Sequence, residues 1–196
     1  MSLPPGCFIK LRYPVRVTSS SDTGGAHDAA AATAAEWIAR LDLRPHPEGG
    51  HYRETYRSAE LLTHLPPRFT GPRAMATSIW FLLEAPAVSA LHRIKSDEIW
   101  HFHAGATLLI SEIAADGTLT ERRLGLDPGD TPQAVIRAGH WFGAQLAASR
   151  SWTLAGCTVA PGFDFTDFEL ADRTTLTTQY PTHRILIEKL TRGSGF

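Results

Sequence analysis

Hydrophobic positions along the chain recur mainly with the two-residue period of a β-strand. The runs are short and are separated by turns that contain glycine, proline or aspartate, which is typical of a sheet-rich domain. The expected strands cover residues 51–58, 76–85, 88–94, 98–104, 106–114, 118–124, 133–137, 141–146 and 151–160. Asp116-Gly117 between two of these runs is a strong hairpin signal. Many short strands of this kind predict an all-β protein built as a jelly-roll barrel.

Helical patterns occur only near the two ends of the chain. The alanine-rich stretch 29–41 predicts a helix with Asp28 as its N-cap, ending before Pro45. A second short helix is expected over residues 183–190, opened by Pro181. Residues 60–73 hold three prolines and are expected to form a loop. We therefore predict an irregular segment over residues 1–27 and one β domain with short flanking helices over residues 28–196.

Composition narrows the function classes. The net charge is −1 without a long run of like charge, so a basic nucleic-acid-binding surface is not expected. No apolar run reaches the length of a membrane span, and the first residues lack the apolar core of a signal peptide. Two cysteines, Cys7 and Cys157, imply neither a disulfide framework nor a cysteine zinc site. The sequence thus predicts a cytoplasmic protein with reduced thiols.

The polar residues best suited to chemistry gather in one stretch, residues 89–105. It holds His92, Glu98, Trp100, His101 and His103 on two neighbouring expected strands. Imidazole and carboxylate side chains on adjoining strands of a closed sheet can bind a metal or transfer protons near neutral pH.

This stretch resembles the first cupin motif, a glycine, five residues, His-x-His, three or four residues, Glu, six residues and Gly. His92, Glu98 and Gly105 fit that frame, whereas Ile94 replaces the second histidine and Pro86 the leading glycine. The second cupin motif is matched at Gly139, while Arg137 and Phe142 replace its proline and histidine.

Three segments together resemble one cupin family of bacterial and fungal proteins whose function is largely unassigned. They are HPEGGHYRETYRS at 46–58, SDEIWHFHAG at 96–105 and VAPGFDFTDFEL at 159–170. The resemblance implies a single-domain double-stranded β-helix, a small-molecule ligand in the barrel and a homodimer. One fold hosts many functions, so it implies much less about the chemistry.

A built-in metal is not predicted. The resemblance leaves His92 and Glu98 as the two retained ligands of a cupin metal site, which normally has three histidines and a glutamate, and two protein ligands make a weak site. His101 would complete a site with His92 and Glu98 if a bulge turned its strand. On a regular strand, His101 and His103 face away from Glu98 and Trp100.

Metal-free acid–base chemistry is the favoured enzymatic hypothesis. His92 would be the base, and Glu98, with its pKa raised by burial, would be the acid. Trp100 and Arg53 would hold the ligand, and Ser78, Trp80 and Phe142 would contribute to the pocket. Which face of strand 51–58 lines the pocket is left open.

Three functions are carried forward. The first is an isomerase- or epimerase-type protein that acts on a small polar metabolite, a sugar or a carboxylate. The second is a cupin that binds such a molecule without turnover, in which His92 and Glu98 satisfy each other. The third is a metal-dependent cupin oxygenase or isomerase.

The remaining candidate residues are expected to be structural. We expect Cys157 to act as a buried apolar residue, Asp164 and Asp167 to cap or pair at the surface, and the phenylalanines of residues 163–168 to fill the core.

Overall fold

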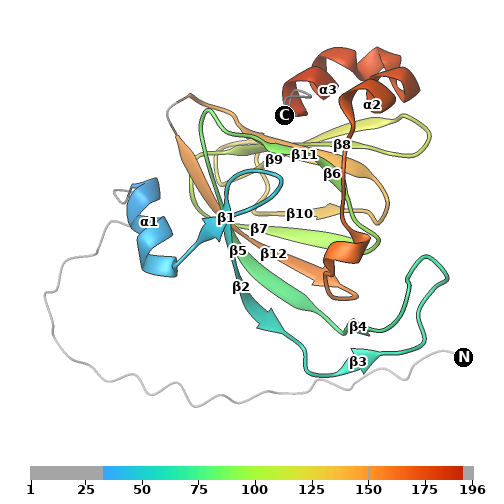
Figure 1. Ribbon diagram of the computed structural model, residues 1–196. Coiled ribbons are helices and arrows are strands. Elements are labelled where there is room, and N and C mark those ends of the chain that lie inside the picture. Colours follow the sequence, from blue (N-terminus) through green and yellow to red (C-terminus); the bar gives the residue numbers. More distant parts are fainter. Residues whose placement is uncertain (1–32, 150, 192–196) are drawn as a thin grey trace, which may run out of the picture.

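Two antiparallel β-sheets face each other and enclose the interior of a barrel (Figure 1). The computed structural model of the 196-residue chain describes residues 33–149 and 151–191. The irregular segment expected over residues 1–27 and the expected cap at Asp28 lie outside the described residues. The all-β prediction is confirmed.

The larger sheet has six strands in the order β1-β2-β5-β12-β7-β10. Strand β12 lies between β5 and β7 and pairs with both over nearly its whole length. The strands are β1 (Arg44–Pro45), β2 (His51–Arg57), β5 (Thr77–Glu84), β7 (Asp97–Gly105), β10 (Gln133–Ile136) and β12 (Trp152–Ala160).

The second sheet has five strands in the order β13-β6-β11-β8-β9. Its hairpin β8–β9 turns at Gly117, whose φ of 86° lies in the left-handed region, as the Asp-Gly signal predicted. Its strands are β6 (Ser89–Arg93), β8 (Leu108–Ile113), β9 (Leu119–Leu124), β11 (Trp141–Leu146) and β13 (Glu169–Leu170).

The stretch 60–73 is not only a loop. It holds β3 (Leu61–Leu62), which pairs with β4 (Arg73–Ala74) in a two-stranded ribbon beside the barrel (Figure 1). Two residues per strand are enough to fix the ends of an otherwise proline-rich connection.

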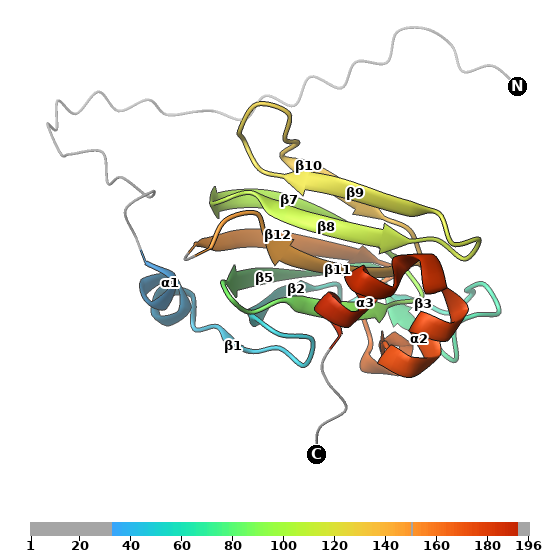
Figure 2. The same ribbon diagram turned by 90° about the horizontal axis from the view of Figure 1, so that it is seen from above.

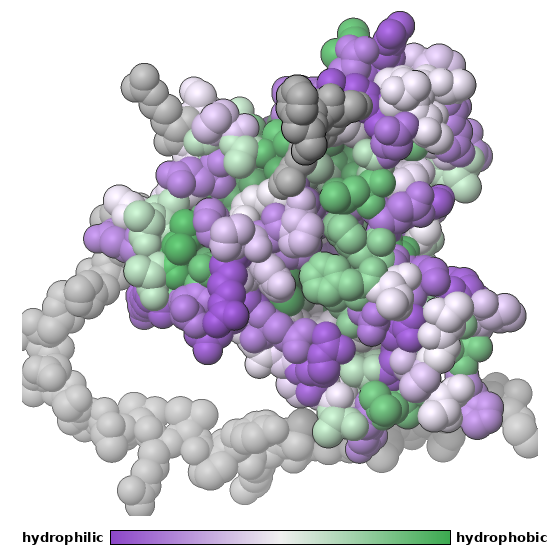
Figure 3. All heavy atoms as spheres, viewed as in Figure 1, coloured by the Kyte–Doolittle hydropathy of each residue, from purple (hydrophilic) through white to green (hydrophobic). Residues whose placement is uncertain are grey.

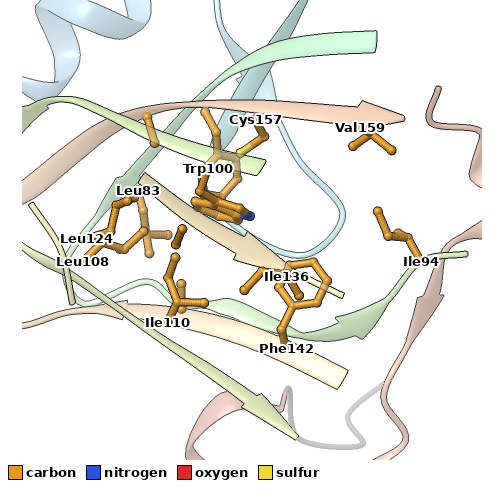
Figure 4. Packing of buried hydrophobic residues seen from close by; sticks show 14 residues of the cluster. Leu83, Ile94, Trp100, Leu108, Ile110, Leu124, Ile136, Phe142, Cys157 and Val159 are labelled. Atoms are coloured by element: carbon orange, nitrogen blue, oxygen red, sulfur yellow. The ribbon is translucent and has the colours of Figure 1, made fainter. Parts of the chain in front are cut away.

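Alternation along the strands separates an inner face from an outer face. The inner face carries the main hydrophobic cluster, in which Trp100, Phe81 and Phe142 are the largest fully buried side chains. Figure 4 shows Trp100 of the larger sheet and Phe142 of the second sheet projecting into the same interior. The cluster fills one part of the barrel and leaves a cavity in the other.

Helix α1 (Ala34–Leu41) covers part of the outer face of the six-stranded sheet. Thr33 is its N-cap and forms a capping box with Glu36, so the helix begins five residues after the position expected for an Asp28 cap. Trp37 of α1 packs with Trp80, Leu82 and Trp152 in a second hydrophobic cluster. This explains why β5 is apolar on both faces.

The five-stranded sheet is covered on its outer face by helices near the end of the chain (Figure 2). The predicted helix is confirmed as α3 (Arg184–Leu190), preceded by the 3-10 turn η3 (Pro181–His183). Helix α2 (Arg173–Gln179), capped by Asp172, was not predicted, because its sequence RTTLTTQ is rich in β-branched threonine. No helix of the described residues is long and apolar enough to cross a membrane.

Candidate functional site

A cavity of about 320 Å³ lies between the two sheets at the end of the barrel where β2 and the turn before it meet β6. Its walls combine aromatic side chains with carboxyl and imidazole groups, which suits a small organic ligand. The aromatic lining residues are Tyr52, Phe81, Trp100, Phe163, Phe165 and Phe168. On the face shown in Figure 3, hydrophobic side chains lie at the centre and hydrophilic ones border them.

Glu48 and His92 form a buried pair in the cavity wall. His92 Nε2 lies 3.1 Å from Glu48 Oε2, and the other carboxylate oxygen accepts a hydrogen bond of 2.9 Å from the hydroxyl of Ser89. His92 Nδ1 lies 2.7 Å from the carbonyl oxygen of Ala90. That carbonyl can only accept, so Nδ1 carries a hydrogen. A hydrogen bond between Nε2 and Glu48 therefore requires one further proton, which the two side chains share.

Burial sets the charge of the imidazole. It lowers the pKa of His92 to about 4, although the hydrogen bond to the Ala90 carbonyl works in the opposite direction. At neutral pH the ring on its own is therefore uncharged, and the shared proton is available for exchange with a ligand.

Glu98 is a buried carboxylic acid in the same cavity. Burial and, to a smaller extent, the nearby charge of Glu48 raise its pKa to about 8, although a hydrogen bond with the Cys157 thiol acts in the opposite direction. At neutral pH Glu98 therefore holds its proton and can donate a hydrogen bond. Burial also raises the pKa of Cys157 well above its usual value, so this thiol is not a nucleophile near neutral pH. The cysteine is buried in the main hydrophobic cluster, as expected for an apolar residue.

The turn before β2 places Glu48. Gly49 and Gly50 have φ angles of 118° and 67°, which glycine adopts without strain. A side chain at Gly50 would come within 2.6 Å of the carbonyl oxygen of Leu82, so the turn presses directly on β5. The backbone carbonyl of Glu48 also accepts a hydrogen bond from the amide of Ala90 on β6. The turn thus delivers a carboxylate from outside the strands into the barrel.

Sequence reasoning assigned no chemical role to Glu48. Residues 46–50 have the composition of an ordinary turn, and no spacing rule links them to His92. The available signal was that the segment HPEGG is one of the three segments that carry the family resemblance.

The structure brings three of the predicted site residues together. His92, Glu98 and Trp100 all line the cavity. Phe142 lies directly behind His92, with a distance of 4.0 Å between the ring centroids, and belongs to the core. Its contact with the imidazole supports the ring from the side of the five-stranded sheet.

Three predicted ligand-binding residues lie on the other side of the sheet, which corrects that expectation. Arg53 is about half exposed and donates to the carbonyl of Leu41. Ser78 contacts Thr158 across strands, and the Trp80 ring lies 4.8 Å from that of His103. The physical reason is alternation, because Thr77, Ile79 and Phe81 are the residues of β5 that line the cavity.

The open question about strand 51–58 is answered by its inner residues Tyr52 and Glu54, which line the cavity. A bulge between Glu54 and Tyr56 then shifts the alternation, so that Arg57 also reaches the lining. Its guanidinium donates to Glu54 Oε1 and Oε2 at 3.0 and 2.6 Å and to the carbonyl of Phe163 at 3.1 Å.

A second buried ion pair anchors the segment that carries the lining residues Phe163, Phe165 and Phe168. Arg73 donates to both carboxylate oxygens of Asp167, at 2.7 and 2.8 Å, and Lys95 Nζ lies 3.3 Å from the same carboxylate. Asp167 belongs to the 3-10 turn η2 (Phe165–Asp167), which Asp164 caps. Asp164 is therefore a cap as expected, whereas Asp167 pairs in the interior rather than at the surface.

The positions that hold a metal in cupins do not fit one here. Ile94 and Phe142 carry no donor atoms, and His101 faces outward beside Gln133, with its Nδ1 3.3 Å from the amide nitrogen. Among the residues that the structure describes, no group of three or more histidine, cysteine, aspartate or glutamate side chains is placed to hold a metal ion. A metal site of His92, Glu98 and His101 would require β7 to be rebuilt.

Two facing antiparallel sheets around an interior site are the arrangement of the double-sheet jelly rolls, which include the cupins. The chain belongs to the family described as Cupin superfamily (DUF985), whose sequence profile matches residues 35–171. The predicted fold and the resemblance to this cupin family are thereby confirmed.

Two solved structures resemble the chain over most of its length. Protein SO0799 from Shewanella oneidensis is 40% identical, with 82% of this chain and 98% of that one covered and a TM-score of 0.74. A hypothetical protein from Leishmania major is 33% identical, with 82% and 99% covered and a TM-score of 0.75. Comparison with curated proteins gives no match.

Proposed function

We propose that the barrel binds a small neutral polar molecule and moves a proton between a carbon atom and an oxygen atom of it, as an isomerase or epimerase does. The observation that carries this proposal is the placement of the buried Glu98 carboxyl group in the same cavity as the buried Glu48–His92 pair, with the pKa of Glu98 raised and that of His92 lowered. Two groups whose surroundings drive their protonation apart are the usual basis of paired acid and base roles.

The roles follow from the protonation states. The Glu48–His92 pair without its shared proton is the base, and it takes a proton from a carbon atom next to a carbonyl group. The electrons of that C–H bond form a carbon–carbon double bond, and the carbonyl oxygen receives the proton of Glu98. For an epimerisation, the enol oxygen returns its proton to Glu98 while the base returns a proton to the other face of the same carbon atom. For an isomerisation, the carbon atom that lost its proton carries a hydroxyl group, which gives its proton to Glu98 while the base protonates the former carbonyl carbon.

The charge of the cavity supports a neutral ligand over an organic acid. Four carboxyl groups line it, those of Glu48, Glu54, Glu98 and Asp164. The arginine of the lining, Arg57, already donates to Glu54 and to a backbone carbonyl. Of the two classes expected from the sequence, a hydroxylated sugar-like compound therefore fits better than a carboxylate.

Deuterium wash-in tests the proposal. The protein is incubated in D₂O with neutral aldoses, ketoses and cyclic ketones, and loss of carbon-bound hydrogen is followed by proton NMR. We expect exchange above the buffer rate for at least one compound, reduced by about 10²–10⁴-fold in Glu98→Gln. Equal exchange in the wild type and in Glu98→Gln contradicts the assignment.

A binding protein without turnover is the second candidate. It is favoured by the fact that both ring nitrogens of His92 already have partners in the protein. Thermal stabilisation by a compound that shows no exchange would support this candidate.

A homodimer and a cytoplasmic location stay predictions. Light scattering of the purified protein and fractionation of the cells that produce it test them.

A further inference from the structure

The indole N–H of Trp100 is a buried hydrogen-bond donor without an acceptor among the described residues. The side chain is only 1% exposed and also lines the cavity. A buried donor that the protein leaves unpaired in a binding cavity is a site for an acceptor atom of a ligand.

The direction of the indole is fixed by its neighbours. Trp100 lies on the inner face of β7 opposite Cys157 of β12, and its ring meets that of Phe81 edge to face at 5.4 Å. In Figure 4 the nitrogen end of the ring is turned toward the side of the barrel where Ile94, Phe142 and Val159 lie. Ile94 and Val159 line the cavity as well.

We propose that the indole N–H of Trp100 donates a hydrogen bond to a carbonyl oxygen of the bound molecule, so that the cavity selects neutral carbonyl compounds. This inference rests on the proposed function and names its class of substrate. It makes Trp100 a residue that touches the reacting oxygen rather than an apolar stacking surface.

A carbonyl oxygen fits these groups better than a hydroxyl group. Trp100 offers a donor that cannot accept, and Glu98, two positions earlier on the same face of β7, holds a proton that it can donate. A carbonyl oxygen accepts two hydrogen bonds and brings no hydrogen that needs an acceptor. In the enol-forming step, negative charge grows on this oxygen, and two donors fixed in an apolar wall stabilise it.

Trp37 provides a matched control. Its indole nitrogen is also buried without an acceptor among the described residues. Trp37, however, packs under α1 with its ring centroid 6.4 Å from that of Trp152, on the outer face of the sheet. Trp37→Phe therefore removes the same type of group outside the cavity.

The first experiment measures the hydrogen bond directly. The full chain is labelled with nitrogen-15 in the indole rings of its five tryptophans. Single Phe substitutions at the other four, Trp37, Trp80, Trp141 and Trp152, assign the Trp100 signal by elimination, so no Trp100 variant has to fold. The probes are cyclohexanone and methylenecyclohexane, which share a ring but differ in the acceptor oxygen. We expect a downfield shift of the Trp100 N–H proton with cyclohexanone alone and an unmoved Trp37 signal.

The second experiment measures deuterium wash-in into cyclohexanone. We expect Trp100→Phe to slow it by about 10²–10³-fold, as for loss of one donor to an oxyanion, with the shape of the pH profile unchanged. The Trp37→Phe variant should catalyse deuterium wash-in into cyclohexanone at the wild-type rate.

The outcomes separate the two proposals. A Trp100 shift without exchange supports carbonyl binding and contradicts the acid–base function. Exchange that is equal in Trp100→Phe and the wild type, or that proceeds while the Trp100 signal stays unmoved, overturns the role of Trp100 and leaves the acid–base function standing. Neither a shift nor exchange with cyclohexanone overturns the selection of neutral carbonyl compounds.

Discussion

His92 Nε2 lies 3.1 Å from Oε2 of Glu48. This contact joins a histidine of the first cupin motif to a turn that the motif does not include. Both side chains are nearly inaccessible to solvent. This chain has Ile94 and Phe142 where cupins have two metal ligands, and it presents the remaining histidine to a carboxylate instead. Several measurements test what this arrangement does.

Glu48→Gln should abolish the base without unfolding the protein. The amide keeps the shape of the side chain and can still donate to His92 Nε2 and accept from Ser89. We expect proton exchange to fall by about 10²–10⁴-fold, while the free energy of unfolding changes by about 1–2 kcal/mol. Deuterium wash-in and urea denaturation measure the two quantities. A variant with wild-type exchange would show that Glu48 only holds the turn in place.

Glu98 should make the protein less stable as the pH rises. The folded state keeps the proton of Glu98 up to a pKa of about 8, whereas the unfolded chain loses it near the ordinary value of 4.5. This contribution is complete below pH 4.5 and is lost as the pH rises through 8. The carboxyl group of Glu98 faces Glu48 and Cys157. Both of these residues are unchanged in the Glu98→Gln variant.

The test uses the range from pH 6.5 to 8.5, because Glu98 still loses its proton there and His92 does not titrate. His92, with a lowered pKa of about 4, acts in the opposite direction, and its contribution is lost only as the pH falls from 6.5 through 4. We expect the free energy of unfolding of the wild type to fall by roughly 2 kcal/mol relative to Glu98→Gln between pH 6.5 and 8.5. Parallel curves for the two proteins would mean that Glu98 is ionised in the folded state at neutral pH.

The Arg73–Asp167 pair should be costly to break on one side. Both side chains are buried, so Asp167→Asn leaves the guanidinium without its carboxylate. We expect the free energy of unfolding to drop by about 3–5 kcal/mol, and less in the double variant Arg73→Met with Asp167→Leu. A double-mutant cycle of Arg73→Met, Asp167→Leu and the double variant, measured by urea denaturation, gives the coupling between the two residues. Additive losses would show that the two residues act independently.

Arg53 and Arg57 form a natural pair of test and control, because they lie on opposite faces of β2. Arg57→Ala removes the hydrogen bond to the Phe163 carbonyl at the cavity, and we expect ligand affinity to change by about fivefold. Arg53→Ala removes an exposed contact to Asp42, so we expect unchanged affinity and less than about 1 kcal/mol in stability. Calorimetric titration with any compound that passes the exchange screen measures both. A larger effect of Arg53→Ala would point to a ligand on the outer face of the sheet.

The sequence predicted the strands well because most of them have one polar face or clear turn residues, as at Asp116-Gly117. It could not orient β5, since Trp80 and Leu82 are covered by α1 while Ile79 and Phe81 face the interior. When a strand is apolar and buried on both faces, its sequence does not indicate which face is the inner one. Ser78 and Trp80 were therefore assigned to the cavity and lie outside it.

The site was predicted only where it coincides with a strand pattern. His92, Glu98 and Trp100 follow from alternation and the cupin spacing. Glu48 and Arg57 do not, because a tight glycine turn places the one and a β-bulge the other. Both features change the direction of a side chain by backbone geometry that local composition does not encode.

The position of β12 also governs how the chain can fold. This strand is the last long one in the sequence, yet it lies in the middle of the six-stranded sheet, between β5 and β7 (Figure 1). Until it pairs, β5 and β7 expose unsatisfied backbone edges, and Glu98 has no Cys157 beside it. Contacts between residues so distant in sequence form slowly, so we expect folding on a scale of milliseconds to seconds, and association of partly folded chains through those two open edges.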